Sequence, residues 1–534
     1  MVREHRGKIS ADALIAVGVG LIALVCYVLT LAPDVLYGDS AEFQALSYTL
    51  GITHTTGYPV YLLLAKIFGT IFPAGTFAYR VNLLSAIYAA GTVSGVYLVA
   101  RSITHSRVGA VYGCLALGIA HSFWSQAVIA EVYTLATLVL TWSVYCLCRW
   151  EEDPAHKNGW LLACVLLLGL GVHTVVELVV PAVGIFVLMT FRAKRLPARQ
   201  WLRSIGAAAA GGAVGAAIFI LVFYVSDSVV NPPTSFLNVT LVPSHSLWGA
   251  SAADLDSFAE RLYHTVVPLQ WGGALFSGEA VYMGKELGRY LDALGGLDFT
   301  LPMLLLGFLG WIVAFVRRPR LTGFMLIGFS TLLFYIINYQ VSSKFVFYLA
   351  TYVFLAVWMG AGAGYLLEKL GEILAERGNR PVFWAGFGVS LLVLGLIFLA
   401  PSAGSRWDAL QAGRATFYTD DDYTYPVNDL NEPRRTAEEI LQRFPDNAVL
   451  LMGWRTLYAA VYVANVEQNL TGITFREASP YPSQSQLPDS LVDEVNGFLQ
   501  AGRPVYAESN YKNLRQNYQV SRVPGSDWVQ LLPK

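Results

Sequence analysis

The sequence has little charge for its length. Of its 534 residues only 14% are Asp, Glu, Lys or Arg, whereas a soluble globular protein carries about 25%. The net charge of −1 excludes the strongly basic surface typical of nucleic-acid-binding domains. All 5 cysteines lie inside apolar runs, without the spacing of a zinc site or a disulfide framework. The sequence also lacks internal repeats and heptads, and its C-terminal tail lacks a glycine-rich phosphate loop.

Long apolar runs take the place of charge. Apolar residues make up 55% of the chain, and the mean hydropathy is +0.49. A hydrocarbon core of ~30 Å needs about 20 apolar residues per helical crossing, so we expect a polytopic α-helical membrane protein with about 11 transmembrane helices. The expected crossings lie near residues 13–31, 80–100, 107–122, 127–148, 159–173, 175–191, 204–225, 300–316, 320–340, 345–367 and 382–400.

Lys and Arg set the orientation of these crossings. Residues 107–150 would form a helix about 66 Å long, so they must turn near His121. If residues 159–190 form two crossings, the cations of 192–203 lie on the same side of the membrane as the N-terminus and the other cation-rich turns. The positive-inside rule then places the N-terminus in the cytoplasm and the C-terminus outside it. The short loops favour a bacterial inner membrane.

Three polar regions face outward in this topology. They are a first loop at 32–79, a second loop at 226–299 and a tail at 401–534, which we expect to be a small α/β domain beside a transmembrane domain of residues 1–400. In the tail, Thr436-Ala-Glu-Glu439 predicts a capping box that opens a helix. The other elements expected there are a helix at 491–500 and strands at 448–452, 505–507, 517–522 and 528–532.

Ionisable side chains at membrane crossings are functional candidates, because burying a charge in lipid is costly. In the predicted topology they gather at the outer face. Asp39, Glu42 and His54 lie in the first loop, His121 in the turn after the third crossing, Glu131 at the start of the fourth and His173 at the end of the fifth.

These residues also have purely structural interpretations. Asp39 and Glu42 could cap a helix N-terminus. His54 lies in the turn-forming segment His54-Thr-Thr-Gly-Tyr-Pro59. His173 could pair with Glu177, one helical turn later. The capping interpretation does not explain why the acidic pair directly follows an anchor helix.

An outward site has no access to cytosolic nucleotide sugars or ATP, so an activated donor must arrive within the membrane. A polyprenyl-phosphate sugar fits this requirement. Its transfer to an acceptor hydroxyl needs a carboxylate as general base, and Asp39 is the expected base. The departing phosphate needs cations. The outward cations available for it are Lys66, Arg80, Arg261 and Lys344.

Several short motifs, taken in order, resemble a known family. The motifs are Gly38-Asp-Ser-Ala-Glu-Phe43, His54-Thr-Thr-Gly-Tyr-Pro59, Arg80-Val-Asn-Leu-Leu-Ser85, Phe123-Trp124 with Ala130-Glu-Val-Tyr133, and Gly169-Leu-Gly-Val-His173. With the exported tail, they resemble the GT-C glycosyltransferases. Within that superfamily they are similar to the bacterial and animal multipass family whose animal member is a protein O-mannosyltransferase. The resemblance is dense over residues 30–180.

The resemblance implies a membrane glycosyltransferase that moves mannose or a similar hexose from a polyprenyl-phosphate donor. The acceptor is a hydroxyl on a protein, lipid or glycan, and the superfamily implies inversion at the anomeric carbon. Asp39 and Glu42 are the implied catalytic residues. Some GT-C members use a divalent metal, which leaves open Mg²⁺ or Mn²⁺ at Asp39 and Glu131. The residues expected to line the donor and acceptor site are His54, Tyr58, Lys66, Arg80, His121, Trp124, Glu131, His173, Arg261, His264 and Lys344.

Two positions depart from the family pattern. Thr55-Thr56 stands where the family usually has a proline pair, and Ser342-Ser343-Lys344 stands where an acidic residue is common. The alternative function is a transporter or flippase of a lipid-linked solute. That class more often has two-fold repeats and ionisable residues at the bilayer midplane, and the sequence has neither.

Overall fold

The computed structural model describes residues 10–267, 272–278, 280–341, 344–376, 386, 395, 431–478, 480, 485–509 and 511–534. The chain divides into two compact units, each assembled from three separate stretches of sequence. Unit 1 combines Met1–Leu31, Ser85–Ala217 and Ala274–Tyr418. Unit 2 combines Ala32–Leu84, Ile218–Gly273 and Thr419–Lys534. The first outer loop and the tail expected from the sequence therefore share one unit. The predicted domain boundary at residue 400 lies outside the described residues.

Unit 1 is built from helices, the structure that satisfies every backbone N–H and C=O within an apolar segment. Helices α4 and α11 each also supply residues to unit 2. The helices of unit 1 are α1 (Ala11–Leu29), α4 (Phe77–Arg101), α5 (Arg107–Ile119), α6 (His121–Ala127), α7 (Tyr133–Glu152), α8 (Asn158–Gly169), α9 (Thr174–Glu177), α10 (Val180–Ala193), α11 (Ala198–Tyr224), α13 (Ala280–Asp292), η6 (Ala293–Asp298), α14 (Leu301–Arg317), α15 (Pro319–Ile337) and α16 (Phe345–Glu376).

Six helices among the described residues are long and apolar enough to cross a membrane, or up to 8 spans if each of two bent pairs is one span. The bent pairs are α5 with α6 and the segment α13–η6 with α14. Six of the expected crossings coincide with these six helices: 13–31, 80–100, 175–191, 204–225, 320–340 and 345–367.

The other five expected crossings have different outcomes. Those at 107–122 and 300–316 fall in the two bent pairs, while those at 127–148 and 159–173 correspond to α7 and α8. The crossing at 382–400 lies outside the described residues, except for positions 386 and 395. The total of about 11 crossings therefore stays a prediction.

Two predicted helix breaks are confirmed. The chain bends by 67° between α5 and α6, directly before His121. The segment 159–190 is likewise broken, because α8 ends at Gly169 and α9 begins at Thr174. Gly171 in that break has a φ of 60°, a left-handed conformation that glycine adopts without steric cost.

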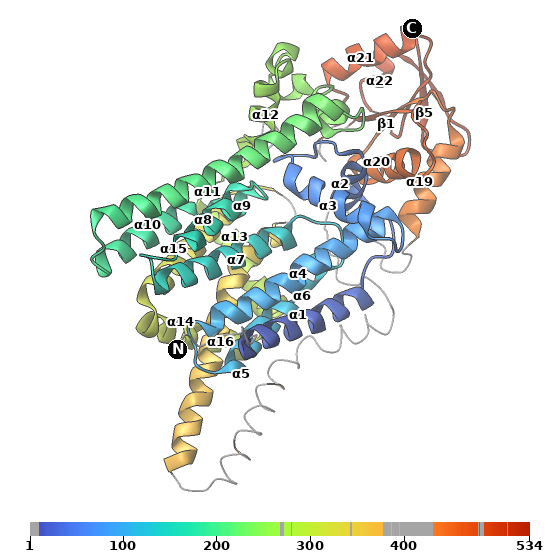
Figure 1. Cartoon of the computed structure of the whole chain (residues 1–534). Helices are drawn as coiled ribbons and strands as arrows, with labels where there is room; N and C mark the ends of the chain where they lie inside the picture. Colours follow the sequence, from blue (N-terminus) through green and yellow to red (C-terminus); the bar gives the residue numbers. More distant parts are fainter. Residues whose placement is uncertain are drawn as a thin grey trace. The chain divides into compact units, whose positions relative to one another are not determined.

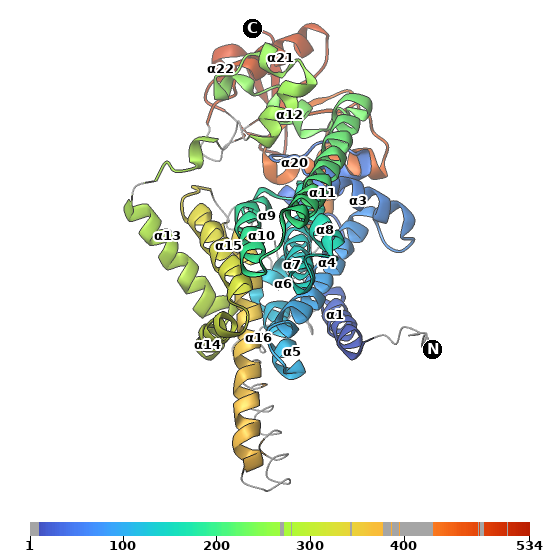
Figure 2. The same cartoon turned by 60° about the vertical axis from the view of Figure 1, so that its left-hand side comes forward.

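Small residues let the longest helix of unit 1 approach its neighbours closely. Helix α16 packs along α14 and α5 (Figure 2). A Cβ added at Gly310 would lie 1.7 Å from the carbonyl oxygen of Trp358, and one at Gly362 would lie 2.0 Å from that of Leu306. Only glycine fits at these contacts, the kind of small-residue packing by which membrane helices associate.

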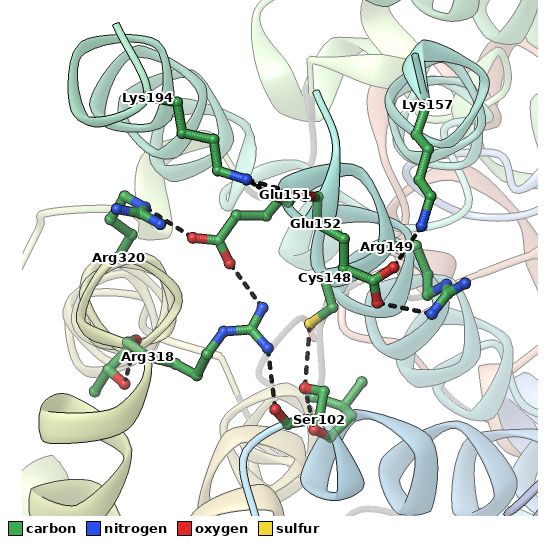
Figure 3. Close-up of polar contacts among 11 residues, drawn as sticks. Ser102, Cys148, Arg149, Glu151, Glu152, Lys157, Lys194, Arg318 and Arg320 are labelled. Atoms are coloured by element: carbon green, nitrogen blue, oxygen red, sulfur yellow. Dashed lines mark hydrogen bonds and ion pairs between the residues drawn. The ribbon is translucent and has the colours of Figure 1, made fainter. Parts of the chain in front are cut away.

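The turns predicted to lie together in the cytoplasm do meet at one end of unit 1. The buried Glu151 lies 2.7 Å from Arg318 Nη2 and 2.8 Å from Arg320 Nε, and Lys194 donates to its backbone carbonyl (Figure 3). Arg318 also donates to the carbonyl of Ser102 at 3.0 Å. These contacts link four turns that are far apart in sequence. The cytoplasmic location of this end stays a prediction.

Unit 2 joins short helices to one β-sheet, and in it α20 packs on α2 (Figure 1). Its helices are α2 (Gly38–Thr49), α3 (Pro59–Ile71), η1 (Val225–Val230), η2 (Leu237–Leu241), η3 (His245–Trp248), η4 (Ala252–Leu255), α12 (Phe258–Val266), α19 (Glu432–Arg443), α20 (Trp454–Val461), η7 (Tyr462–Glu467), α21 (Asp489–Gln500) and α22 (Leu514–Asn517). A short 3-10 helix, η5 (Gly272–Ala274), begins in unit 2 and ends at the first residue of the next stretch of unit 1. The strands are β1 (Val449–Met452), β2 (Thr474–Glu477), β3 (Val505–Ala507), β4 (Gln519–Arg522) and β5 (Val529–Leu532).

The sheet has the strand order β2-β1-β3-β5-β4. Strand β1 pairs in parallel with β2 and β3, so Leu450 lies opposite Phe475 on one side and Tyr506 on the other. Strand β5 is antiparallel to both β3 and β4. The four residues of β1 are all buried, as expected for the central strand of a covered parallel region.

Most of the tail predictions are confirmed, and one is wrong. The four expected strands and the helix near 491–500 are present, while β2 had not been predicted. The expected capping box at Thr436 is wrong, because α19 begins at Glu432, four residues earlier, with Pro433 in its first turn. Thr436 lies within the helix, where its hydroxyl accepts a hydrogen bond of 2.9 Å from the Tyr37 hydroxyl.

Candidate functional site

The acidic pair of the first loop lies at the start of α2, which hydrogen bonds hold in place. The side chain of Gln44 accepts from the backbone N–H of Leu36 at 3.1 Å and donates to Asn82 at 2.8 Å. Asn82 in turn donates to the carbonyl of Ala32 at 2.9 Å. These contacts fix the segment before α2. The side chains of Asp39 and Glu42 therefore project from a constrained helix turn.

Glu42 and His54 form a close pair. Glu42 is fully buried, and Glu42 Oε1 accepts from the backbone N–H of His54 at 2.8 Å. Its Oε2 lies 2.5 Å from His54 Nδ1, so the two atoms share a hydrogen bond. Burial raises the pKa of the Glu42 carboxyl, and the neighbouring His54 opposes this shift. The pair thus fixes the imidazole ring and leaves Nε2 as its outward nitrogen.

Asp39 lies on the other side of that ring. Asp39 Oδ2 is 3.9 Å from His54 Nε2, and the Asp39 side chain is 36% exposed, enough to reach a substrate. Trp454, at the start of α20, donates its indole N–H to Asp39 Oδ1 at 2.7 Å. Trp454 therefore orients one oxygen of the Asp39 carboxylate, and the other oxygen lies on the side of the His54 imidazole. The structure brings together Asp39, His54 and Glu42, as the sequence suggested.

A third acid that sequence reasoning missed, Glu477, lies near this group. Glu477 ends β2, is 2% exposed, and accepts a hydrogen bond of 2.6 Å from the Thr240 hydroxyl. Burial raises the pKa of Glu477 to about 8, and the negative charge of Glu42 contributes to the shift. The Glu477 carboxyl is therefore protonated at neutral pH and adds a neutral hydrogen-bonding group to the site.

The turn after His54 packs closely against α12. Gly57 has a φ of 83°, and a Cβ there would lie 2.8 Å from Thr265 Cγ2. Tyr58 is the N-cap of α3, with a φ of 40°. Its ring contacts Phe43 and His54 at centroid distances of 5.7 and 5.5 Å. Tyr58 is thus placed against the imidazole, and its predicted role in binding the substrate stays a prediction.

Three cations expected to bind the donor phosphate already have protein partners within unit 2. Arg80 donates to the carbonyls of Gly69, Ala74 and Gly75. Lys66 donates to the carbonyl of Tyr48 at 2.5 Å. Arg261 forms a two-pronged ion pair with the buried Asp227 at 2.8 and 2.9 Å, and donates to two more carbonyls. The structure does not gather these cations around Asp39.

His264 and Lys344 are also placed by local contacts. His264, on α12, contacts the ring of Tyr263 at a centroid distance of 5.1 Å. Lys344, in unit 1, is 7% exposed, and its ammonium nitrogen lies 3.0 Å from the carboxylate of Glu286 and contacts Tyr282. A donor phosphate that bound Lys344 would have to compete with Glu286.

The remaining predicted residues lie in unit 1. His173 is the N-cap of α9, where its Nδ1 accepts from the backbone N–H of Val175 at 3.1 Å. Its ring contacts Tyr133 at 5.2 Å, and Tyr133 lies two residues after Glu131. Glu131 is 4% exposed and lies just before α7, in the turn rather than in the helix. The contact that the structure gives in this part of unit 1 is therefore between His173 and Tyr133.

Two further predicted residues of unit 1 are close in sequence. Trp124 is buried and donates its indole N–H to the Thr30 hydroxyl at 2.8 Å, with Tyr27 against its ring. His121 begins α6. The next residue, Ser122, donates to the buried Asp298 through both its backbone N–H and its hydroxyl. Asp298, which the sequence did not single out, thus fixes the start of α6.

A bound metal would need several ligand side chains close together. Among the described residues, no group of three or more His, Cys, Asp or Glu side chains could hold a metal ion. Around Asp39, the nearest ligand-type atoms are engaged: Glu42 holds His54, and one Asp39 oxygen accepts from Trp454. The divalent ion left open by the sequence stays a prediction.

Residues 39–196 match the family model described as Protein O-mannosyl-transferase TMEM260 N-terminal domain. The chain is 29% identical over 176 residues to Protein O-mannosyl-transferase TMEM260 of Mus musculus, a match that covers 32% of this chain and 24% of that protein. For the Dictyostelium discoideum protein the identity is 22% over 147 residues, covering 27% and 15%. The expected resemblance is confirmed. The matches span only a quarter or less of the relatives' own length.

Solved structures resemble the fold over nearly the whole chain. ArnT from Cupriavidus metallidurans, bound to undecaprenyl phosphate, has a TM-score of 0.51 at 14% identity, with 98% of each chain covered. The oligosaccharyltransferase of Archaeoglobus fulgidus has a TM-score of 0.52 at 13% identity, covering 93% of this chain and 68% of that one. At these identities the likeness shows the fold alone. The fold is GT-C-like, and the chain is an integral membrane protein.

Proposed function

We propose that this protein is a glycosyltransferase that moves mannose or a similar hexose from a polyprenyl-phosphate donor to an acceptor hydroxyl. The proposal places the reaction on the extracytoplasmic side of the membrane. The match of residues 39–196 to a protein O-mannosyltransferase domain supports glycosyl transfer. The undecaprenyl phosphate bound to ArnT, which shares the fold, supports a lipid-linked donor.

The observation that carries the proposal is the arrangement of Asp39, His54 and Glu42. Asp39 is accessible, His54 Nε2 lies 3.9 Å from it, and the buried Glu42 holds the opposite nitrogen of the ring. A carboxylate that faces solvent beside an oriented imidazole can accept a proton from a hydroxyl and pass it on. Purely structural capping would not require this chain of three titratable groups.

The proposed step involves one proton and two bonds. The acceptor hydroxyl oxygen attacks the anomeric carbon of the donor, and its proton moves to Asp39. The bond between that carbon and the phosphate oxygen breaks, and its electron pair leaves with the polyprenyl phosphate. Attack from the face opposite the leaving group inverts the anomeric centre. Asp39 then passes its proton to solvent. The neighbouring His54 can accept this proton on the way.

The departing phosphate needs a cation beside it. Lys66, Arg80, Arg261 and Lys344 stay candidates for it, although each already contacts protein atoms. Among the described residues, Lys66 has one hydrogen-bond partner, the Tyr48 carbonyl, for the three N–H groups of its ammonium, which also lies over the Tyr48 ring. We propose Lys66 as the first phosphate ligand to examine.

The direct test is to incubate the purified protein with a panel of polyprenyl-phosphate sugars and acceptors and to identify products by mass. The proposal predicts one donor that yields a glycosylated acceptor and free polyprenyl phosphate. Movement of an intact lipid-linked sugar across proteoliposomes without any new glycosidic bond would instead support a flippase. Release of sugar to water alone would contradict acceptor transfer.

A further inference from the structure

The tail contributes directly to the neighbourhood of Asp39, although nothing in the sequence assigned it a role. Trp454 is the first residue of α20, directly after β1 and Gly453. Its indole N–H donates to Asp39 Oδ1 at 2.7 Å, across 415 positions of sequence. Both residues belong to unit 2. A neutral donor at this distance stabilises a carboxylate and limits its rotation.

The start of α20 is itself held rigidly. Glu508 Oε2 accepts from the backbone N–H of Gly453 at 2.7 Å, and Glu508 Oε1 accepts from the Thr456 hydroxyl at 3.0 Å. An acid in this place satisfies donors of the first helical turn that have no partner within the helix. The tail thus fixes the backbone that carries Trp454.

The indole ring is braced on three sides. Its centroid lies 5.9 Å from that of His54, 6.1 Å from Phe236 and 5.3 Å from Tyr458, each with an edge-on geometry. Edge-to-face contacts of this kind favour one orientation of each ring. The N–H vector of Trp454 is therefore set before any substrate binds.

We propose that Trp454 is a positioning residue that holds Asp39 Oδ1, so that Oδ2 remains the oxygen available to the acceptor hydroxyl. This inference rests on the proposed function, with Asp39 as the base. A catalytic carboxylate free to rotate would spend part of its time with neither oxygen aligned, and misalignment on the scale of an ångström slows a reaction strongly. The tail is then a part of the catalytic site.

The test compares Trp454→Phe with Trp528→Phe in the full-length purified protein. Both substitutions keep an aromatic ring and remove an indole N–H, and Trp528 is a buried tryptophan that packs on Phe444 at 4.8 Å. We expect W454F to lower kcat about 10- to 100-fold, the loss expected for one hydrogen bond to a charged group. The donor KM should stay within about twofold, since the indole holds the base and not the donor. W528F should leave both constants unchanged.

A second measurement tests the contact without relying on activity. In protein labelled with ¹⁵N at its 13 tryptophans, the indole resonance lost in W454F identifies Trp454. Asp39→Asn should move that resonance more than any other indole signal. Equal kcat values for W454F and W528F, or an unmoved resonance in D39N, would overturn the positioning role. A wild-type protein that transfers no sugar would overturn the proposed function and the catalytic role together, while the resonance would still decide whether the contact exists.

Discussion

Substituting the buried Glu477 by Gln should change how stability depends on pH. The pKa of Glu477 in the folded protein is about 8, against 4.5 for an ordinary Glu, because burial disfavours the charged form. Glutamine has the same shape as the protonated acid and can keep the hydrogen bond of 2.6 Å with Thr240. It carries no charge at any pH. The comparison of the two proteins therefore isolates the ionisation of one side chain.

The sign and size of the effect follow from linkage. Below pH 4.5 both the folded and the unfolded states of the wild-type protein hold the proton, so the substitution changes little. Between pH 4.5 and about 8 only the unfolded state loses it, and the stability of the wild type falls as pH rises. At ~1.4 kcal/mol per pKa unit, the total loss is on the order of 5 kcal/mol. E477Q avoids this loss.

The assay is the melting temperature of detergent-solubilised protein from pH 5 to pH 9, for the wild type, E477Q and the control Glu439→Gln. Glu439 is an exposed acid on α19. The advantage of E477Q should be small at pH 5 and grow to several degrees by pH 9, while the control should track the wild type throughout. A difference between E477Q and the wild type that stays constant across this range would refute the assignment of Glu477 as a buried neutral acid.

Two further substitutions test polar contacts made by charged side chains. Arg80→Ala should lower the free energy of unfolding by about 1–2 kcal/mol, because three hydrogen bonds to backbone carbonyls are lost; an unchanged melting temperature would mean that these bonds contribute nothing. Glu151→Gln should destabilise unit 1 by about 2–3 kcal/mol, since it leaves Arg318 and Arg320 without their shared carboxylate (Figure 3). Chemical denaturation at matched detergent concentration would measure the second effect, and an undiminished midpoint would contradict it.

The sequence predicted best what depends on local pattern. Long apolar runs correctly predicted the long helices. The short apolar segments at 448–452 and 505–507 correctly predicted two strands of the sheet. Strand β2 was missed because Thr474-Phe-Arg-Glu477 contains a single apolar residue, which is too few to show the alternation of a half-buried strand. In the structure Phe475 and Glu477 share the buried face of this strand, and a charged residue at such a position gives the sequence pattern no apolar partner for Phe475.

Side-chain partnerships that span the chain were beyond the sequence. The site pairs Asp39 with Trp454, and Thr240 with Glu477, and no periodicity relates positions so far apart. The prediction that outward cations bind the donor phosphate had the same weakness. Arg261, for example, forms an ion pair with Asp227, which lies 34 residues earlier in the sequence. The charge pattern could identify the outward cations, but it could not show which of them already bind acidic side chains or backbone carbonyls of the protein.

The most direct test of the whole account is the rate of sugar transfer by Asp39→Asn, measured on purified protein with its best polyprenyl-phosphate donor. The matched control is Asp446→Asn, an exposed acid in the loop before β1. We expect D39N to fold normally and to lose activity by at least about 10³-fold, since its amide cannot accept the hydroxyl proton, while D446N keeps full activity. Transfer by D39N at the wild-type rate would contradict the claim that the Asp39 carboxylate performs the reaction.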